Sequence, residues 1–228
     1  VGRAIGIHGM SSQVAAVVAP LFVGLILAGG AGLLSGPGVE RWRFVFVGIA
    51  GVALAATVVF FVVARRSTLP DAGAADRDLL AAVERQWPLI VSGVAIVGAT
   101  GFVWNGVFNF YVTYLTEVKE VSPSVARNLL TVVFVAGVPA FALTGRLADR
   151  VSHVPLLLAI LTGFIVSLVS LTAVSGLAAL VAVSALLGYV IHSLFPAMDT
   201  YMLDSLPDEH RASAYAVFSA TMMLVQAT

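Results

Sequence analysis

Residues 151–198 read VSHVPLLLAILTGFIVSLVSLTAVSGLAALVAVSALLGYVIHSLFPAM and contain no Asp, Glu, Lys or Arg. A helix that crosses the hydrocarbon core of a membrane needs about 20 apolar residues, so this stretch is long enough for two crossings. We expect the break between them near Ser175-Gly176. Because the apolar runs are long and do not alternate with polar residues, they predict helices rather than the strands of a barrel.

The rest of the chain has the same character. Of its 228 residues 60% are hydrophobic and 11% are charged, and its mean hydropathy is +1.02. Soluble proteins contain roughly 25% charged residues, so the composition predicts an all-α integral membrane protein. The stretches without charge give these expected spans, the last of them cut short: about 5–29, 44–64, 88–116, 128–145, 154–173, 176–198 and 212–228.

Several functions are excluded or disfavoured by what the sequence lacks. The net charge is zero, so no global field attracts nucleic acid. Cys is absent, which excludes disulfides and thiolate metal sites. The four His residues show no ligand spacing, and the sequence contains none of the common hydrolase or phosphate-binding motifs. We therefore expect no enzyme, metal or cofactor, although a membrane enzyme that uses Asp199 and His192 stays open, as does a scaffold or receptor.

Lys and Arg residues are divided unevenly between alternate loops. One set of loops holds eight of them and the opposite set holds four. Because cytoplasmic loops carry the excess, we expect a multi-pass protein of the cell (plasma) membrane with residue 1 in the cytoplasm. The cytoplasmic set is Arg3, Arg65, Arg66, Arg77, Arg85, Arg146, Arg150 and Arg211, and the outer set is Arg41, Arg43, Lys119 and Arg127.

The longest loop, residues 65–87, lies on the expected cytoplasmic side. From Asp76 its apolar residues gather on one helix face, which predicts a short helix on the membrane surface; a disordered linker is the alternative. The residues on that face are Leu79, Leu80, Val83 and Trp87.

Polar side chains separate the expected spans into two kinds. The second span has only Thr57 as a polar side chain and the fifth only Ser and Thr, which favours helices that face lipid. In the third span Asn105 and Asn109 share one helix face with two glycines, and Trp104 is adjacent. A helix that lines a watery cavity carries such groups, so we expect these residues to contact substrate. Interhelical hydrogen bonding is the alternative explanation.

The sixth span carries a similar stripe. Gly188, His192, Pro196 and Asp199 recur along one face, with Tyr189 beside them. We expect Tyr189 and His192 to line the cavity, although a buried, hydrogen-bonded His is common. Asp199 is the only acid at depth in a span, and we expect it to serve either ion coupling or a salt bridge that gates the cavity.

The two ends of the chain resemble each other. Gly2-Arg3-Ala4 opens the first span and His210-Arg211-Ala212 opens the seventh, on the same expected side of the membrane. A unit of six helices repeated in parallel would produce this similarity, since the first and seventh spans are six helices apart.

A loop motif then connects the chain with a known family. Gly145-Arg146-Leu147-Ala148-Asp149-Arg150 resembles the cytoplasmic loop motif of the major facilitator superfamily, in which a Gly precedes Asp-Arg. Ser152 and His153 stand where that motif usually has Gly and Arg.

Two further patterns support this resemblance. The sequence from Pro196 through Asp204 and Pro207 to Arg211 is similar to the family's loop after the tenth helix. The first span is similar to the family's glycine-rich fifth helix, which is associated with antiporters, and ordinary small-residue packing is the alternative for it. The small and helix-bending residues of this pattern are Gly6, Ala15, Ala19, Pro20 and Gly24.

The resemblance implies a bundle of twelve helices in two six-helix halves related by a parallel repeat. The chain would then supply about seven of the twelve, from the fifth to part of the eleventh, and both its ends would be cuts. Residues 1–64 would end the amino-terminal half, 65–87 would link the halves, and 88–228 would belong to the carboxy-terminal half. The missing amino-terminal helices of the same protein would be its partners.

The resemblance also implies secondary active transport by alternating access. We expect proton-coupled export of a drug or metabolite through the bilayer, with an uptake symporter as the alternative. We expect Asp149 to act as a cytoplasmic latch, a contact that holds the outward-open state and breaks on inward opening. Its carboxylate can dock on the free N–H groups that begin the first span. Loop charges in water are the alternative. The other expected latch residues are Arg3, Gly145, Arg150, Asp204 and Arg211.

Overall fold

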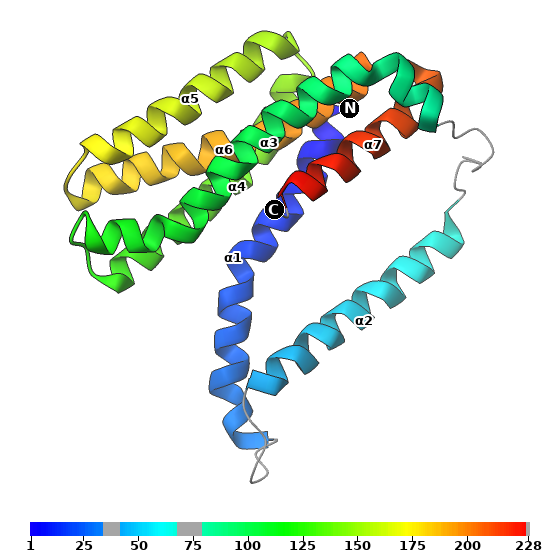
Figure 1. Ribbon diagram of the computed structural model, residues 1–228. Coiled ribbons are helices and arrows are strands. Elements are labelled where there is room, and N and C mark those ends of the chain that lie inside the picture. The colour runs from blue at the N-terminus through cyan, green and yellow to red at the C-terminus, as the bar shows by residue number, and fades with distance from the viewer. Residues whose placement is uncertain (34–41, 68–78, 227–228) are drawn as a thin grey trace. The chain divides into compact units, whose positions relative to one another are not determined.

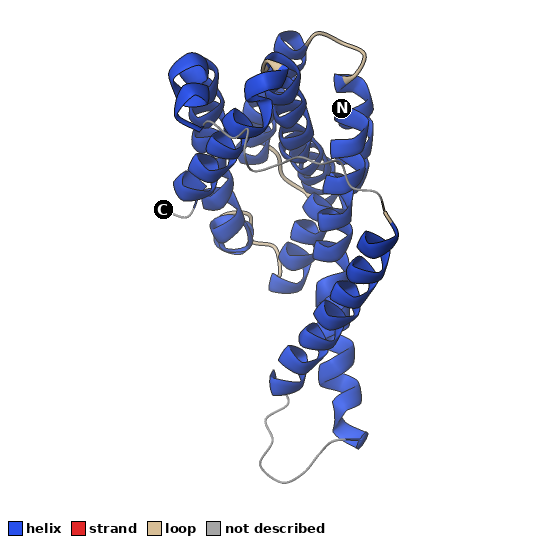
Figure 2. Ribbon diagram, turned by 90° about the vertical axis from the view of Figure 1, so that its right-hand side faces the viewer, coloured by secondary structure: helices blue, strands red, loops and turns tan. Residues whose placement is uncertain are grey.

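The computed structural model describes residues 1–33, 42–67 and 79–226, and within them it contains seven helices and no strand (Figures 1 and 2). This confirms the expectation of an all-α chain. The helices are α1 (Gly2–Leu33), α2 (Trp42–Arg66), α3 (Leu79–Glu117), α4 (Pro123–Ala148), α5 (His153–Ala173), α6 (Leu177–Ser205) and α7 (Asp208–Gln226). Arg41, Arg77 and most of the expected linker, residues 68–78, lie outside the described residues.

Six of these helices, α1 to α6, are long and apolar enough to cross a membrane. The seventh, α7, has 19 residues, and its first turn contains Asp208 and Glu209. Length and composition therefore assign six spans to the described residues, whereas the sequence predicts that a seventh begins at about residue 212. The expected spans all coincide with helices, which extend by up to nine residues beyond the expected ends.

The connection between α5 and α6 confirms the break expected near Ser175-Gly176. Gly176 has a φ of +83°, a conformation that glycine adopts without steric cost and that other residues rarely adopt. The start of α4 is fixed in a different way, by a helix cap. There Ser122 accepts a hydrogen bond from the Val125 N–H at 3.4 Å, and Pro123 occupies the first turn, where its missing N–H costs nothing.

The described chain divides into two compact parts. One comprises the first 14 residues together with α3 to α7, and the other comprises the rest of α1 with α2. In the second part the two helices meet at Gly48, where the side chains of Phe22 and Ile26 fill the space that a Cβ would occupy. The candidate functional residues below lie in the first part, except four small or helix-bending residues of α1.

Helix α6 is the centre of the larger part. It packs against α3, α4, α5 and α7, and α3 also packs along α7 (Figure 1). Leu187, Met198 and Met202 of α6 are fully buried, as are Leu115 of α3 and Phe218 of α7. A helix surrounded in this way has its side chains fixed by neighbours on several sides, so α6 is well placed to position functional groups.

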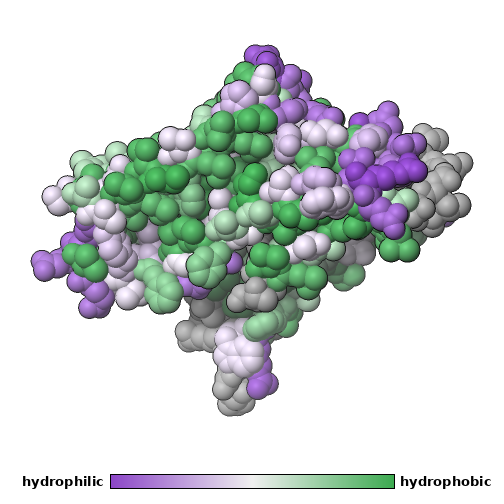
Figure 3. Space-filling view, turned by 45° about the horizontal axis from the view of Figure 1, so that its top comes forward, coloured by the Kyte–Doolittle hydropathy of each residue, from purple (hydrophilic) through white to green (hydrophobic). Residues whose placement is uncertain are grey.

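The sequence predicts that α2 and α5 face lipid, and the structure shows that the two helices differ in burial. Helix α2 has no buried residue. Helix α5 buries one face against α6, including Leu157 and Phe164, and exposes the opposite face, including Leu158 and Ile165. On the face drawn in Figure 3, hydrophobic side chains cover most of the middle and hydrophilic side chains gather at the margins, as expected for a protein surrounded by lipid.

Helix α3 differs from the sequence prediction at its start. The surface helix and the third span form one continuous helix of 39 residues, with Pro88 inside it. A fully buried Ala82 holds the first turns against the bundle. Arg85 adds contacts to α7, with its Nη1 3.1 Å from His210 Nε2 and 3.9 Å from Glu209 Oε1. The residues of the expected apolar face all stay exposed, so the contact with α7 uses another face of this segment; they are Leu79, Leu80, Val83 and Trp87.

Candidate functional site

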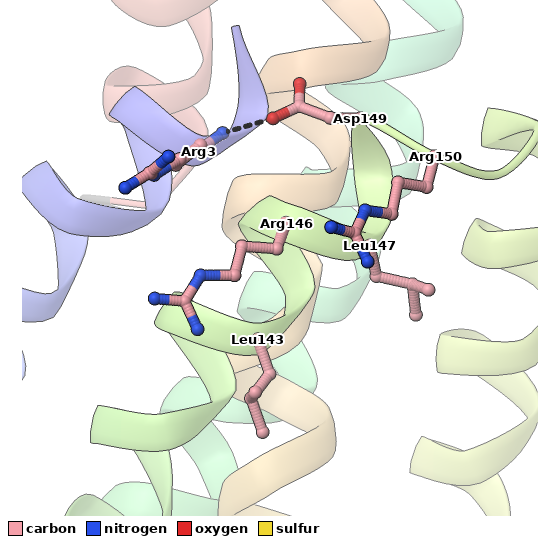
Figure 4. Close-up of a pocket in the computed structure, with 6 residues that line it drawn as sticks. All are labelled: Arg3, Leu143, Arg146, Leu147, Asp149 and Arg150. Atoms are coloured by element: carbon pink, nitrogen blue, oxygen red, sulfur yellow. Dashed lines mark hydrogen bonds between the residues drawn. The ribbon is translucent and has the colours of Figure 1, made fainter.

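The Asp149 carboxylate caps the first turn of α1. Its Oδ1 accepts a hydrogen bond from the Gly2 N–H at 2.8 Å. Its Oδ2 accepts one from the Arg3 N–H at 2.8 Å, and Figure 4 shows this second bond. The Val1 nitrogen lies 3.2 Å from Oδ1. The first N–H groups of a helix lack partners within the helix and carry its positive dipole end, so an anion is stabilised there. One side chain from the end of α4 thereby holds α1.

Glycines make this docking possible. A Cβ at Gly6 would lie 2.5 Å from the Phe141 carbonyl oxygen and 3.2 Å from the Gly145 Cα. A Cβ at Gly2 would lie 2.5 Å from the Gly145 oxygen and 2.9 Å from Thr200 Oγ1. These atoms are mostly backbone and cannot rotate away. Gly145 is the first Gly of the loop motif, and it lets the backbones of α1 and α4 approach closely. A larger residue there would force the two helices apart.

The pKa of Asp149 is lowered from its ordinary value. Partial burial raises the pKa, and the hydrogen bonds from the Arg3 and Gly2 N–H groups lower it. A carboxylate that accepts backbone N–H groups is favoured in its charged form. Asp149 is therefore ionised at neutral pH, as its capping of α1 requires.

The other expected latch residues form separate contacts. The Arg3 guanidinium points away from the Asp149 carboxylate, so only its backbone joins the cap (Figure 4). Arg150 is exposed. Asp204 lies 3.4 Å from His153 Nε2, and Arg211 lies 2.6 Å from Asp208 Oδ1.

Arg211 also donates to the Leu206 carbonyl at 3.1 Å and so covers the end of α6. Arg211 pairs with Asp208 rather than with the other latch residues because Asp208 is one turn away on the same helix. Sequence reasoning missed His153, although it occupies the motif position that usually holds Arg. Its partner Asp204 lies in the last turn of α6, so this pairing requires the end of α6 to lie beside the start of α5.

His192 lies in a cluster of aromatic rings from three helices. Its ring centroid is 5.4 Å from that of Trp104 on α3 and 6.0 and 6.2 Å from those of Phe134 and Phe141 on α4. We call these residues the His192 cluster. His192 is 3% exposed, and its Nδ1 is 2.6 Å from the Gly188 carbonyl oxygen. A carbonyl only accepts, so Nδ1 is the donor, and Nε2 is the acceptor in the neutral ring.

Two glycines place His192. A Cβ at Gly137 would lie 2.8 Å from the His192 ring and 2.9 Å from Gln13 Oε1. A Cβ at Gly188 would clash with the backbone of Val133, so this glycine serves the crossing of α4 and α6 rather than a cavity wall. Gln13 Oε1 is buried and has no hydrogen-bond partner among the described residues. Sequence reasoning missed Gln13, whose only signal was a long polar side chain in an apolar span.

The remaining cavity candidates are less enclosed. Asn105 and Asn109 are exposed, and the Asn109 amide donates to the Asn105 carbonyl at 2.8 Å. Tyr189 is half-buried and packs against the core. The structure therefore brings Trp104 and His192 together and leaves the two Asn side chains on the surface of α3.

Asp199 forms a hydrogen bond with Tyr215 of α7, and Tyr215 also bonds to Ser219. The acid is half-buried and lies six residues before the end of α6. The bond joins α6 to α7, so a change in the charge or position of Asp199 acts directly on that helix pair.

The expected packing residues of α1 fall into two groups. Gly6 packs tightly on α4, as described above. Ala15, Ala19, Pro20 and Gly24 are exposed, and a Cβ at Gly24 would meet no atom within 4 Å. No group of His, Asp and Glu able to hold a metal ion occurs within the described ranges.

The fold and these contacts define a multi-pass helical membrane protein whose helices cross at glycines. The family model of the Major Facilitator Superfamily matches residues 1–228, and the chain belongs to this family. The family consists of membrane transporters of small molecules rather than enzymes. No curated protein and no solved structure matched the chain.

Proposed function

We propose that the protein carries out secondary active transport of a small organic solute by alternating access, as a proton-coupled exporter of a drug or metabolite. The His192 cluster is the observation that carries the proposal. His192 lies 15 residues after the start of α6 and 13 before its end, which corresponds to the middle of the bilayer. Transporters of this architecture bind substrate near the midplane.

The chemistry of the cluster favours a neutral or amphipathic solute. The segments of α3, α4 and α6 at this depth contain no Asp, Glu, Lys or Arg, so a multiply charged anion would find no counter-charge. Aromatic rings bind apolar groups, while His192 Nε2 and Gln13 Oε1 both accept hydrogen bonds from a donor. A solute with an apolar body and one or two hydroxyl or amine groups fits these residues.

Asp199 is the proposed coupling residue. Among the acids of the described helices it lies farthest from a helix end, six residues before the end of α6, and it is held by Tyr215 of the neighbouring helix. Protonation would remove the charge from the Asp199–Tyr215 hydrogen bond and so change the packing of α6 on α7. Ionisable groups at depth in a membrane are characteristic of proton relays in transporters.

The Asp149 cap is the proposed cytoplasmic latch. While the carboxylate holds the first turn of α1 on the end of α4, the cytoplasmic ends of these helices stay together, which corresponds to the outward-open state. Inward opening requires the loss of two hydrogen bonds to a charged group, and the exposed first turn can then hydrogen-bond to water.

Flux into proteoliposomes tests the proposal. A saturable flux of an amphipathic organic cation or neutral drug, which increases with an imposed proton gradient, is the expected result. Flux without saturation would contradict transport, and saturable flux that ignores the proton gradient would contradict coupling at Asp199. Running the assay with the gradient in each direction separates export from uptake.

A further inference from the structure

An open cavity of about 610 Å³ lies where the first turn of α1 meets the end of α4 (Figure 4). We call it the arginine cavity. Its position follows from the Asp149 cap, because that contact brings the Arg3 side chain beside Arg146 of α4 and Arg150 just after the end of α4. The residues that line it are Arg3, Leu143, Arg146, Leu147, Asp149 and Arg150.

The cavity carries excess positive charge. Arg3, Arg146 and Arg150 contribute three guanidinium groups, and none of the three has an ion pair or a side-chain hydrogen bond with any residue that the structure describes. The single acid, Asp149, has both oxygens bonded to the backbone of α1. Its charge is thus bound to the helix end, and the guanidinium groups face the cavity without a counter-ion from any part of the chain that the structure describes.

The cavity also has an apolar side. Leu143 and Leu147 are 48% and 42% exposed, and residues 143, 146, 147 and 150 share one face at the end of α4. Leu143 lies toward the middle of the span, and Arg150 lies beyond the end of the helix. The order along this face is therefore apolar within the bilayer and cationic at its surface.

We propose that the arginine cavity binds the headgroup of an anionic phospholipid, with an acyl chain against Leu143 and Leu147. Guanidinium groups match phosphate oxygens in charge and in paired hydrogen bonds. The cavity lies at the end of the bundle that the excess of Arg predicts to be cytoplasmic, and the cytoplasmic leaflet is the one that carries anionic lipids. Free phosphate would use the arginines alone and would gain nothing from the two leucines.

The opposite end of α4 shows that a positive charge at a helix end is not enough to make a site for an anion. Lys119 there donates to the carbonyls of Thr172 and Val174 at 2.8 Å, so it is occupied by protein. Arg127 is exposed near the start of α4 and does not line the arginine cavity. Arg127 therefore offers a matched control for Arg146, on the same helix and with the same charge.

Native mass spectrometry of the purified protein tests the proposal. Protein released from nanodiscs of phosphatidylcholine with phosphatidylglycerol is expected to retain phosphatidylglycerol. Arg146→Gln is expected to weaken retention about fivefold, the effect of removing one surface Arg from an anionic membrane. Arg127→Gln is expected to retain as much as the unchanged protein. Equal thermal stability of both variants in phosphatidylcholine shows that folding is intact.

Three results would overturn the proposal. They are equal retention of phosphatidylcholine and phosphatidylglycerol, equal weakening by the two substitutions, and displacement of the lipid by inorganic phosphate at the same concentration. The last would assign the cavity to a free anion. If Arg146→Gln fails to fold, Arg150→Gln replaces it against the same control. None of these readouts measures transport, so failure here is distinct from failure of the proposed function.

Discussion

Replacing Asp149 by Asn removes the charge of the α1 cap while keeping the size of the side chain. Both carboxylate oxygens are in use, one on the Gly2 N–H and the other on the Arg3 N–H. An amide has one acceptor oxygen, and its NH₂ group would face the second donor. The substitution therefore breaks one hydrogen bond, weakens the other, and removes the negative charge from the helix terminus.

The expected size of the effect follows from these contacts. A hydrogen bond to a charged group contributes about 1.5–3 kcal/mol, and a charge at a helix end about 0.3–1 kcal/mol. The Asp149 side chain is 32% exposed, so the lower ends of these ranges apply. A total of about 2 kcal/mol corresponds to a change of about 30-fold in the ratio of latched to unlatched protein.

A single cysteine reports this ratio. The chain contains no Cys, and Thr200 is fully buried beside Gly2. Thr200→Cys should react slowly with a membrane-impermeant maleimide while α1 is docked. Adding Asp149→Asn should increase the labelling rate by up to about 30-fold, and in proteoliposomes it should lower the transport rate without preventing membrane insertion.

The control is Asp208→Asn at the same end of the bundle. Asp208 pairs with Arg211 but is 89% exposed, and exposed pairs contribute about 0–1 kcal/mol. It should change neither labelling nor transport appreciably. If Asp149→Asn labels and transports at the rate of the unchanged protein, the carboxylate is not a latch and the reasoning from its two hydrogen bonds fails.

The pH dependence of the latch has a definite sign. Because the pKa of Asp149 is lowered in the folded protein, its contribution to stability is fully present above the ordinary pKa of about 3.9 and is lost as the pH falls through the lowered value. Between pH 5 and 8, as a rough physiological range, the carboxylate stays ionised. Asp149→Asn should therefore shift a transport profile by a constant factor in this range.

Three further substitutions test the other contacts. Gly6→Ala should lower the melting temperature because its Cβ meets the Phe141 carbonyl, at a cost of about 1–3 kcal/mol, whereas Gly24→Ala, with open space around it, should not; equal melting temperatures would contradict the close crossing. His192→Gln should raise the KM for an amphipathic solute more than it lowers kcat, and unchanged transport kinetics would remove His192 from the substrate site. Tyr215→Phe should alter the dependence of flux on the proton gradient because it removes the hydroxyl that bonds to Asp199, and an unaltered dependence would show that this bond has no part in coupling.

Local patterns in the sequence predict most of the fold. The apolar runs predict every helix, and the Ser175-Gly176 break is recognisable because glycine adopts the backbone conformation found there. The sequence predicts a surface helix from Asp76 and a separate span from residue 88, whereas the structure joins them into one helix with Pro88 inside it. Proline fits a helix after its first turn if the lost hydrogen bond is tolerated, and here contacts of Ala82 and Arg85 with the bundle and α7 hold the preceding turns in place.

The site was predictable only where one local rule controls it. The affinity of a helix start for an anion is such a rule and makes Asp149 a candidate cap, whereas its choice of α1 joins residues 147 positions apart in the sequence. The pairing of Asp204 with His153 requires knowing that the end of α6 lies beside the start of α5. The surroundings of His192 depend on the register of α4 against α6, which Gly137 and Gly188 set by allowing close approach. A single sequence contains these glycines but does not say which backbone each one meets.

Phe141 connects the two candidate sites. Its carbonyl oxygen is the atom that Gly6 approaches, and its ring packs against Gly9 and lies 6.2 Å from the His192 ring. Withdrawal of the first turns of α1 would remove contacts from both the backbone and the ring of Phe141. Because interiors are packed too closely to absorb such a loss, the ring has to shift, and His192 is its neighbour. The glycine crossing that lets Asp149 reach α1 thus also places the latch one side chain away from the proposed substrate site.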